Sequence, residues 1–478
     1  MRVAQPTAAA EVLRAPGTVP VNRISLPFLQ VQERKWLLGT VDTGLAVVWL
    51  LGGYYAWRAW AHPTSPSFLY VSWDWVLGGA TLWLLVSCMA GAYELKTADR
   101  FLDAARVTIT VSIIVTVASL LAYYGFLKTY PRPALGLAIV GMPVSVLGWR
   151  AVYASLLRRP AYATRLLVVG NATLCSALTQ VAQGREGSYR VLGFVSERAA
   201  SGPQYLGDTA HLADIADRYQ AHRIVVGPRQ SLSNSLVAVL SGCIERGLEV
   251  IDFNAAYEEI AGKVAVEHAD DFWLAALPTR PNTSSLEEAA MRVVDVVGAA
   301  AGLALTFILA PFIVTAIMIE SGTHVIYRQE RLGRAGRPFI VYKFRSMRRD
   351  AEAKGAQWAV AGDLRTTRVG RFLRRTHLDE LPQFWNVLRG EMSLVGPRPE
   401  RPEFTEALAR SIPFYRLRLA VRPGLSGLKQ IRVGYAASPE EHLDVLRHDL
   451  YYIKHRSLAL NLVIMARTLG SVLGMKGR

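Results

Sequence analysis

Charged residues are scarce in this chain of 478 residues. Asp, Glu, Lys and Arg make up 19% of it, whereas hydrophobic residues make up 51%. Soluble domains usually carry about a quarter charged residues, and the mean hydropathy here is +0.21. The composition therefore indicates that part of the chain lies in lipid.

Acidic residues are the scarcer of the two charged classes. The chain has 38 Asp and Glu against 54 Lys and Arg, which gives a net charge of +16. On a membrane protein, such an excess points to cytoplasmic loops and anionic lipid headgroups. A nucleic-acid partner is not expected, because the sequence shows no recognisable binding module. Nucleotide-linked and lipid-linked phosphates remain open as partners.

Cysteine is nearly absent, and the N-terminus has no leader pattern. Cys88, Cys175 and Cys243 are too scattered for a metal motif or a disulfide framework. This usage fits domains that face a reducing cytosol. The N-terminal residues lack a basic segment followed directly by an apolar core, so they are not a cleavable signal peptide. We expect residues 1–35 to form a flexible cytosolic tail.

Apolar runs dominate residues 36–160. Four stretches of roughly 20 residues could each cross a hydrocarbon core; they lie at about 36–57, 75–93, 107–126 and 134–156. Trp and Tyr crowd their ends, as in interfacial belts. Lys and Arg gather before the first stretch, between the second and third, and after the fourth. We therefore predict a four-helix transmembrane domain with both ends in the cytoplasm.

Strand-like and helix-like patterns alternate over residues 164–277. Short β-branched runs occur at about 166–170, 191–195, 223–227 and 248–253, and a helical pattern covers 234–246. This alternation predicts a small doubly wound, Rossmann-like α/β domain. The first turn has a single glycine, Gly170, where a dinucleotide fingerprint needs three. A regulatory or assembly role is favoured over cofactor binding.

A further uncharged run extends from 296 to 319. Pro311 lies in it, and proline inside a regular helix costs about 3 kcal/mol. Spanning would also place the basic, cysteine-free remainder outside the cell. We therefore predict a re-entrant helix over 293–320, broken at Pro311, that enters one leaflet and returns. An ordinary kinked fifth span remains the alternative.

Two adjacent carboxylates, Asp379 and Glu380, lie in an otherwise basic stretch. An exposed acidic pair at the start of a helix is the plain alternative, because carboxylates suit the helix dipole there. Upstream, a predicted strand ends in Lys343 and Arg345, which share a face by the strand period of two. Such cations can bind phosphate oxygens, although a solvated or lipid-facing surface is the other explanation.

Four motifs follow in order, and together they carry a resemblance. They are Lys343-Phe344-Arg345-Ser346-Met347, Asp379-Glu380-Leu381-Pro382-Gln383 with Asn386-Val387-Leu388-Arg389-Gly390, Met392-Ser393-Leu394-Val395-Gly396-Pro397-Arg398-Pro399, and Arg422-Pro423-Gly424-Leu425-Ser426-Gly427. From about residue 292 to 478, the chain resembles the bacterial sugar transferases. These are the polyprenyl-phosphate hexose-1-phosphate transferases of the monotopic phosphoglycosyl transferase superfamily. The whole layout is similar to the long form of the exopolysaccharide type.

The resemblance implies a fold and a reaction. Residues 285–478 would form a mixed α+β catalytic domain with the re-entrant helix, on the cytoplasmic face of the bacterial cytoplasmic membrane. The enzyme would move a sugar-1-phosphate from a UDP-sugar to undecaprenyl phosphate and release UMP. Asp379 would be the nucleophile, forming a phosphosugar–aspartyl intermediate, and Glu380 would help to hold Mg²⁺.

The resemblance also assigns supporting residues. The cations expected on the phosphates are Lys343, Arg345, Arg375, Arg398 and, with weaker support, Arg422. The residues expected to shape the site are Pro311, Gln383, Asn386 and Pro397. After Gly427 the family usually has Trp-Ala-Gln, whereas this chain has Leu428-Lys429-Gln430, so the sugar cannot be assigned.

The sequence is compatible with two other functions. One is a membrane-bound NAD-dependent dehydratase or epimerase acting on nucleotide sugars, against which the single glycine at Gly170 argues. The other is a non-catalytic scaffold for polysaccharide assembly. A homodimer through the spans and the α/β domain is compatible with the sequence.

Overall fold

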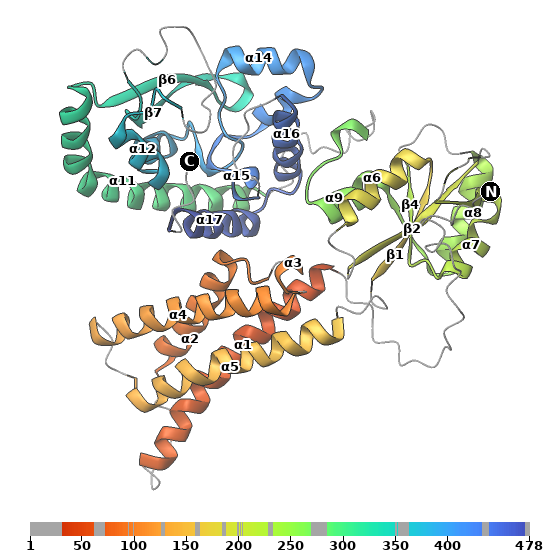
Figure 1. The fold of residues 1–478 in the computed structure, drawn as a ribbon, viewed down its shortest axis with the longest axis horizontal. Coiled ribbons are helices and arrows are strands. Elements are labelled where there is room, and N and C mark those ends of the chain that lie inside the picture. The colour runs from red at the N-terminus through yellow and green to blue at the C-terminus, as the bar shows by residue number, and fades with distance from the viewer. Residues whose placement is uncertain are drawn as a thin grey trace, which may run out of the picture.

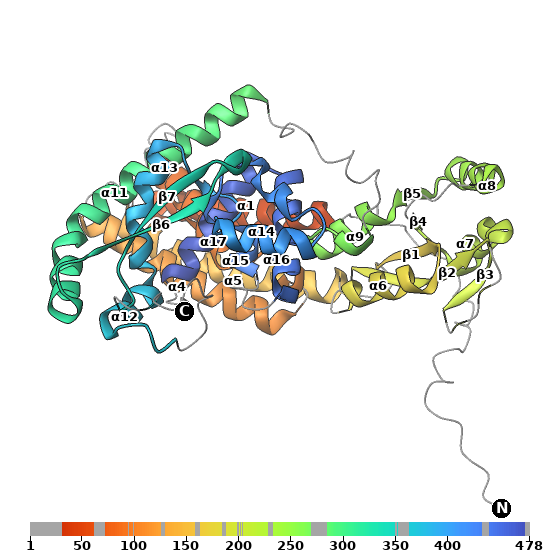
Figure 2. The ribbon, with the colours of Figure 1, turned by 90° about the horizontal axis from the view of Figure 1, so that it is seen from above.

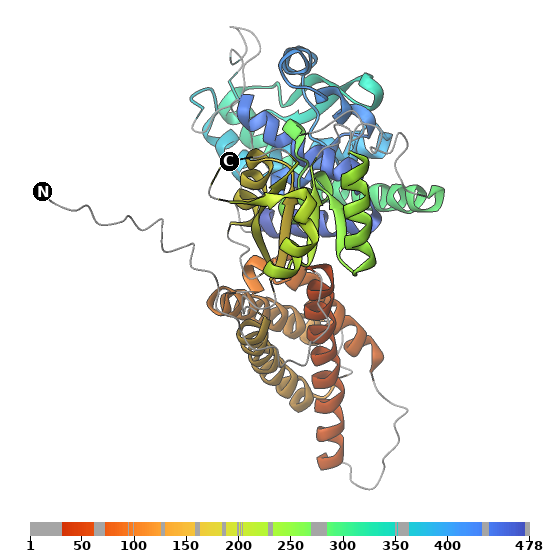
Figure 3. The same ribbon diagram turned by 90° about the vertical axis from the view of Figure 1, so that its right-hand side faces the viewer.

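The computed structural model describes residues 31–61, 72–93, 95–98, 100–125, 130–157, 163–183, 188–197, 200, 202, 204–227, 233–268, 284–348, 351, 363–432 and 439–473. Three bodies are visible in Figure 1: a helical bundle, an α/β domain beside it and a larger mixed body above the bundle. Figure 3 shows the bundle below and the mixed body above from a second direction. The predicted tail lies outside the described residues, except that residues 31–35 open the first helix.

The bundle consists of apolar helices and one short helix of four residues, α3 (Leu95–Ala98). The apolar helices are α1 (Val31–Ala61), α2 (Trp73–Met89), α4 (Phe101–Gly125) and α5 (Arg132–Leu157). One buried ion pair crosses the bundle, because Arg150 donates to Asp42 at 2.6 Å. Burying both charges together avoids the large cost of burying either one alone, and the pair ties α5 to α1.

Four helices among the described residues are long and apolar enough to cross a membrane. They are Glu33–Ala61, Phe101–Gly125, Arg132–Ser155 and Ser285–Ser321. The predicted second span forms the shorter helix α2, which has 17 residues. That is the lower end of the length of about 17 to 25 residues that spans hydrocarbon. Three of the four stretches predicted between residues 36 and 160 thus form helices long and apolar enough to span, whereas the second forms a shorter apolar helix.

The α/β domain is built on one parallel sheet in the order β3-β2-β1-β4-β5. Its elements are β1 (Thr164–Val169), α6 (Ala172–Ala182), β2 (Tyr189–Ser196), β3 (Tyr205–Asp208), η4 (Thr209–His211), α7 (Leu212–Tyr219), β4 (Arg223–Val226), α8 (Asn234–Glu245), β5 (Glu249–Asp252), α9 (Phe253–Ala261) and η5 (Val266–His268). Helices α6 and α9 pack on one face, and α7 and α8 on the other. The predicted parallel α/β sheet is confirmed. The sequence reasoning missed β3, a four-residue edge strand without a buried residue.

The mixed body starts with one long helix and continues through two small sheets. Its elements are α11 (Ser285–Ser321), β6 (Ile326–Leu332), η6 (Arg334–Gly336), β7 (Pro338–Phe344), α12 (Arg368–Thr376), η7 (Leu378–Gln383), α13 (Phe384–Arg389), β8 (Ser393–Val395), α14 (Pro402–Ser411), η8 (Tyr415–Ala420), β9 (Gly424–Ser426), α15 (Leu428–Arg432), α16 (Pro439–Lys454) and α17 (Leu458–Leu473). Strands β6 and β7 pair as an antiparallel hairpin, and β8 pairs with β9 in parallel. The predicted α+β composition of this part is confirmed.

Helix α11 is one continuous helix that bends along its length. Pro311 lies inside it, and Figures 1 and 2 show its last part turned sharply away from the first. Proline removes one helix hydrogen bond and crowds the preceding turn, which accounts for a bend. The predicted break is therefore a bend within one helix. The re-entrant passage through one leaflet stays a prediction.

Close packing holds α11 and α17 in place. A Cβ added to Gly302 would lie 2.5 Å from the Phe384 ring, so only glycine lets α11 approach α13 this closely. At the other end of the body, Gly470 of α17 lies against Met89 of α2. The mixed body thus rests on the bundle through its last helix.

Candidate active site

The two carboxylates of the Asp-Glu pair lie in a tight turn after α12. Thr367 caps that helix by accepting from the amide of Gly370 at 2.9 Å. His377 adopts a left-handed conformation with φ of 58°, which ends the helix and opens η7, where Asp379 and Glu380 lie. Asp379 is only 7% exposed. The alternative of an exposed acidic pair is therefore wrong for Asp379.

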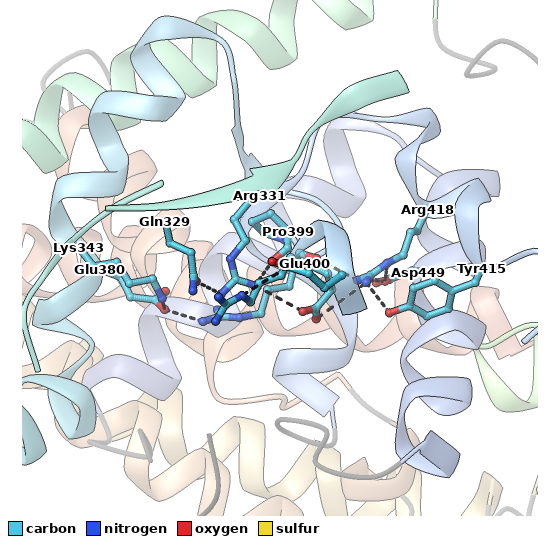
Figure 4. A network of polar contacts seen from close by, with 12 residues as sticks. Gln329, Arg331, Lys343, Glu380, Pro399, Glu400, Tyr415, Arg418 and Asp449 are labelled. Carbon is cyan, nitrogen blue, oxygen red and sulfur yellow. Dashed lines mark hydrogen bonds and ion pairs between the residues drawn. The ribbon is translucent and has the colours of Figure 1, made fainter. Parts of the chain in front are cut away.

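Glu380 is held by cations from two distant segments. Its Oε1 accepts from Lys343 Nζ at 2.8 Å and from an Arg398 guanidinium nitrogen at 2.7 Å (Figure 4). Lys343 comes from β7, and Arg398 comes from the loop after β8. The structure thus brings three of the predicted site motifs onto one carboxylate oxygen. Charge-assisted bonds of this kind are short and strong.

The two carboxyl groups have oppositely shifted pKa values. Burial raises the pKa of Asp379, and the adjacent Glu380 carboxylate raises it further. Burial alone would also raise the pKa of Glu380, but Arg398 and Lys343 outweigh it and hold that pKa well below its usual range. Glu380 is therefore a fixed anion, whereas Asp379 is a buried carboxyl whose ionisation depends on its neighbours.

Arg374, and not its neighbour Arg375, points toward the segment that holds Asp379 and Glu380. Its Nε donates to Ser346 Oγ at 3.0 Å, and a terminal nitrogen donates to Thr366 at 3.3 Å. Its positive charge also lowers the pKa of Asp379. Arg375, the residue selected from the sequence, lies on the exposed side of α12. Adjacent helix residues point about 100° apart, and the sequence alone did not show which of the two faces inward.

Asn386 fixes the strand that carries Lys343. Its side chain is fully buried; Nδ2 donates to the Ile340 carbonyl at 2.6 Å and to Glu391 at 2.7 Å, and Oδ1 accepts from the Tyr342 amide at 3.3 Å. These bonds join α13 to β7 immediately before Lys343. The predicted site-shaping residue therefore lies where it can set the position of that lysine.

The loop that carries Arg398 is held by hydrogen bonds to its backbone. Arg418 donates to the Arg398 carbonyl at 2.9 Å, and Arg331 donates to the Pro399 carbonyl at 3.1 Å (Figure 4). Pro397, predicted to shape the site, accepts from the amide of Gly424 at 2.9 Å. These contacts fix the loop while the Arg398 side chain reaches Glu380.

That loop also packs on the turn that opens β9. A Cβ on Gly424 would lie 2.0 Å from the Gly396 nitrogen, so the two turns meet only because this position is glycine.

Two buried nitrogen atoms flank the pair. Among the described residues, Gln383 Nε2 and His377 Nδ1 have no hydrogen-bond partner. Buried polar atoms are seldom left unpaired, so these are available for a bound group. Gln383 was selected from the sequence; His377 was not, and the structure places it half-buried.

The other predicted residues lie around this centre. Arg345 follows β7 and donates its amide to the Val325 carbonyl at 2.8 Å. Arg422 is half-buried, and burial lowers its pKa, with further lowering by Arg292 and Arg334. The charged residues around Arg422 are thus Arg292, Arg334, Arg456 and the acidic Asp295. Pro311 lies in α11 and not in the turn that holds the pair.

Helix α11 contributes two anchors that the sequence reasoning did not select. Arg292 donates to the carbonyls of Val387 and Leu388 at 2.8 Å each, which caps the end of α13. Asp295 accepts from Ser393 Oγ and from the Leu394 amide, both at 2.9 Å. The sequence signal that could have identified Arg292 and Asp295 is that both are charged residues at the edge of an apolar run.

Comparison with known proteins agrees with this geometry. A family model described as bacterial sugar transferase matches residues 286–475. A Bacillus subtilis protein, named putative undecaprenyl-phosphate N-acetylgalactosaminyl 1-phosphate transferase, is 48% identical over 141 residues, which are 30% of this chain and 76% of that protein. The chain belongs to the bacterial sugar transferase family. The family agrees with the resemblance, and the names of this relative and of the two below describe phosphotransferases.

Two further relatives show how far the likeness extends. The Aeromonas hydrophila UDP-N-acetylgalactosamine-undecaprenyl-phosphate N-acetylgalactosaminephosphotransferase is 39% identical over 234 residues, covering 49% of this sugar transferase and 54% of the relative. The Caulobacter vibrioides UDP-glucose:undecaprenyl-phosphate glucose-1-phosphate transferase is 42% identical over 189 residues, which are 38% of this chain and 69% of that relative. This chain thus spans about half of the Aeromonas relative.

Proposed function

We propose that this sugar transferase moves a sugar-1-phosphate from a UDP-sugar to undecaprenyl phosphate and releases UMP. The names of the relatives above support the donor and acceptor classes. The observation that carries the proposal is the buried Asp379 beside a Glu380 carboxylate that two cations hold at 2.7 and 2.8 Å. Such a step would begin the assembly of a polysaccharide repeat unit on its lipid carrier.

Asp379 is the nucleophile of the proposed mechanism. Its carboxylate oxygen attacks the β-phosphorus of the UDP-sugar and forms an acyl phosphate, while the bond from that phosphorus to the bridging oxygen breaks and UMP leaves. An oxygen of undecaprenyl phosphate then attacks the same phosphorus, which forms the lipid diphosphate and restores the carboxylate. An acyl phosphate is reactive enough to pass the group on, so one difficult exchange becomes two steps.

The surrounding cations stabilise the charge that spreads over the phosphoryl oxygens. Lys343 and Arg398 meet at Glu380 Oε1, so both ammonium and guanidinium groups lie beside Asp379. Arg374 adds a third positive charge. Preorganised donors of this kind supply most of the catalysis of phosphoryl transfer. Gln383 Nε2 would donate to the bound diphosphate.

Magnesium fits the donors of this turn. No group of three or more His, Cys, Asp or Glu side chains suited to a metal occurs in the described part of the chain. Mg²⁺ on a diphosphate needs only one or two protein carboxylates, since substrate oxygens and water complete its shell. Glu380 would hold the ion, which would neutralise diphosphate charge when bound. Full activity in excess chelator would contradict this role.

The bend at Pro311 supports a cytoplasmic, membrane-surface site. We propose that α11 enters one leaflet and returns, which keeps the pair where a soluble UDP-sugar and a membrane-bound phosphate both reach it. Cysteine placed just after Gly333 should be labelled only from the cytoplasmic side of inner-membrane vesicles. Labelling from the outer side would show that α11 spans.

The experiment that tests the function uses Asp379→Asn. We expect detergent-solubilised enzyme to release UMP from one member of a panel of UDP-linked glucose, galactose and N-acetylated sugars when undecaprenyl phosphate is present. Asp379→Asn should reduce this release to background, because an amide oxygen cannot form the intermediate. Unchanged turnover in that variant would remove Asp379 from the nucleophile role. The dehydratase and scaffold alternatives have no support in the matched family or in the relatives named above.

A further inference from the structure

Helix α16 lies between the α/β domain and the catalytic cluster. Figures 1 and 2 show α9 of the α/β domain next to α16 of the mixed body in two perpendicular views. The two helices are almost 180 residues apart in sequence. Their contact is therefore a tertiary contact and does not follow from proximity along the chain.

Ion pairs join the α/β domain to this helix. Glu258, on α9, has a side chain only 4% exposed and accepts from Lys454 and from His455 at 3.0 Å each. Lys263, just after α9, donates to Asp444 at 2.7 Å. Burial alone would raise the pKa of Glu258, but His455 and Lys454 outweigh it and the pKa is lowered. The docking is thus specified by charged side chains, of which Glu258 is buried and its partners are partly exposed.

Two further contacts join α16 to the residues that follow α9. The amide of Val264 donates to the Arg447 carbonyl at 3.1 Å, and the Arg447 side chain pairs with Glu267. A backbone bond between the two domains fixes their relative distance. Together with the ion pairs, it holds α16 along most of its length.

The opposite side of α16 is connected to the loop that carries Arg398. Asp449 of α16 accepts from Arg418 at 2.8 Å, with both side chains buried. Arg418 also donates to Tyr415 at 2.8 Å and to the Arg398 carbonyl at 2.9 Å (Figure 4). Arg398 in turn binds Glu380 at 2.7 Å. Three consecutive contacts thus connect α16 with the Asp-Glu pair, from Asp449 to Arg418, from Arg418 to the Arg398 carbonyl and from Arg398 to Glu380.

We propose that the α/β domain acts as a positioning clamp: by holding α16 through Glu258, it sets Asp449, Arg418 and hence Arg398 against Glu380. A buried ion pair tolerates little displacement, because a separated charge remains desolvated. A shift of the rigid helix is therefore passed to the Arg398 loop and not absorbed by Asp449. This gives the α/β domain a role in catalysis without a ligand of its own. The activity readout below rests on the proposed transferase function; the exchange readout does not.

Charge reversal tests the clamp in the full-length enzyme. Glu258→Lys places a cation against Lys454 and His455 and should release α16. Coupling through packed elements typically amounts to about 2- to 30-fold, so we expect UMP release to fall by that factor. The swap Glu258→Lys with Lys454→Glu restores opposite charges and should recover most of the rate. Glu245→Lys, an exposed site on α8 at the other face of the sheet, is the matched control and should leave the rate unchanged.

Amide hydrogen exchange measures the same coupling without any reaction. In Glu258→Lys we expect faster exchange in residues 393–400 and 415–420 as well as in α16, with β7 unchanged; the swap should restore protection. If Glu258→Lys destabilised the whole protein, exchange would be faster in every segment. The experiment would then use the milder variant Glu258→Gln. Normal protection of 393–400 in a variant whose α16 exchanges fast would overturn the clamp. A folded swap variant in which residues 393–400 still exchange fast would also overturn the clamp. If wild-type enzyme released no UMP, the transferase proposal would fail while exchange still decided the clamp.

Discussion

Replacing Asn386 by leucine removes the contacts that hold β7 against α13, and the size of the effect can be worked out. The buried amide makes two bonds to backbone groups of Ile340 and Tyr342 and one to the Glu391 carboxylate. Neutral bonds contribute about 1 kcal/mol each and a bond to a charged group about 2 kcal/mol, so Asn386→Leu should cost about 4 kcal/mol of local stability. Leucine has a similar volume, so no large cavity adds to this figure.

The consequence for activity follows from Lys343, the next side chain on that strand. If its charged bond to Glu380 is lost, about 1.5 to 3 kcal/mol disappears, and kcat/KM should fall about 10- to 150-fold. Amide exchange of residues 338–344 gives the local stability, and UMP release gives the rate. Asn461→Leu is a suitable control, since that buried amide bonds Tyr452 and lies away from β7. Normal protection of β7 and a normal rate in Asn386→Leu would refute the reasoning.

Two other predictions concern the charges around the pair. Lys343 lowers the pKa of Asp379, so Lys343→Met should raise that pKa and move the acid limb of the kcat/KM–pH profile to higher pH; a limb that stays in place or moves to lower pH would contradict this assignment. Arg374→Leu should cost at least about tenfold in kcat/KM, because a charged hydrogen bond is worth roughly 1.5 to 3 kcal/mol, whereas Arg375→Leu should cost less than about threefold. Equal losses in the two variants would show that the inward side chain does not matter for the reaction.

Much of the architecture could be predicted because it depends on local patterns. Apolar runs with aromatic ends gave the membrane helices, and alternating strand and helix patterns gave the parallel sheet. Boundaries were harder: α2 ends at Met89 because the chain turns at 90–93 before α3, although the apolar character continues. The edge strand β3 was missed, because a half-exposed segment of four residues has no distinctive period.

The site divides in the same way. Motif residues such as Lys343, Glu380 and Arg398 could be selected from the sequence, and the structure brings them together at one oxygen. The inward direction of Arg374 depends on tertiary packing against Ser346, which no local pattern encodes. The grip of Arg418 on the Arg398 carbonyl likewise depends on the fold. Second-layer contacts of this kind come from segments distant in sequence, and single-sequence reasoning does not reach them.

The central claim is that Asp379 becomes covalently attached to the sugar phosphate. Enzyme incubated with a UDP-sugar labelled in the β-phosphate, without undecaprenyl phosphate, should retain label after denaturation at low temperature. Peptide mapping should then place the label in the segment that contains Asp379, and adding undecaprenyl phosphate before denaturation should remove it. A protein that turns over normally and never carries label, or that carries it equally well as Asp379→Asn, would contradict the account.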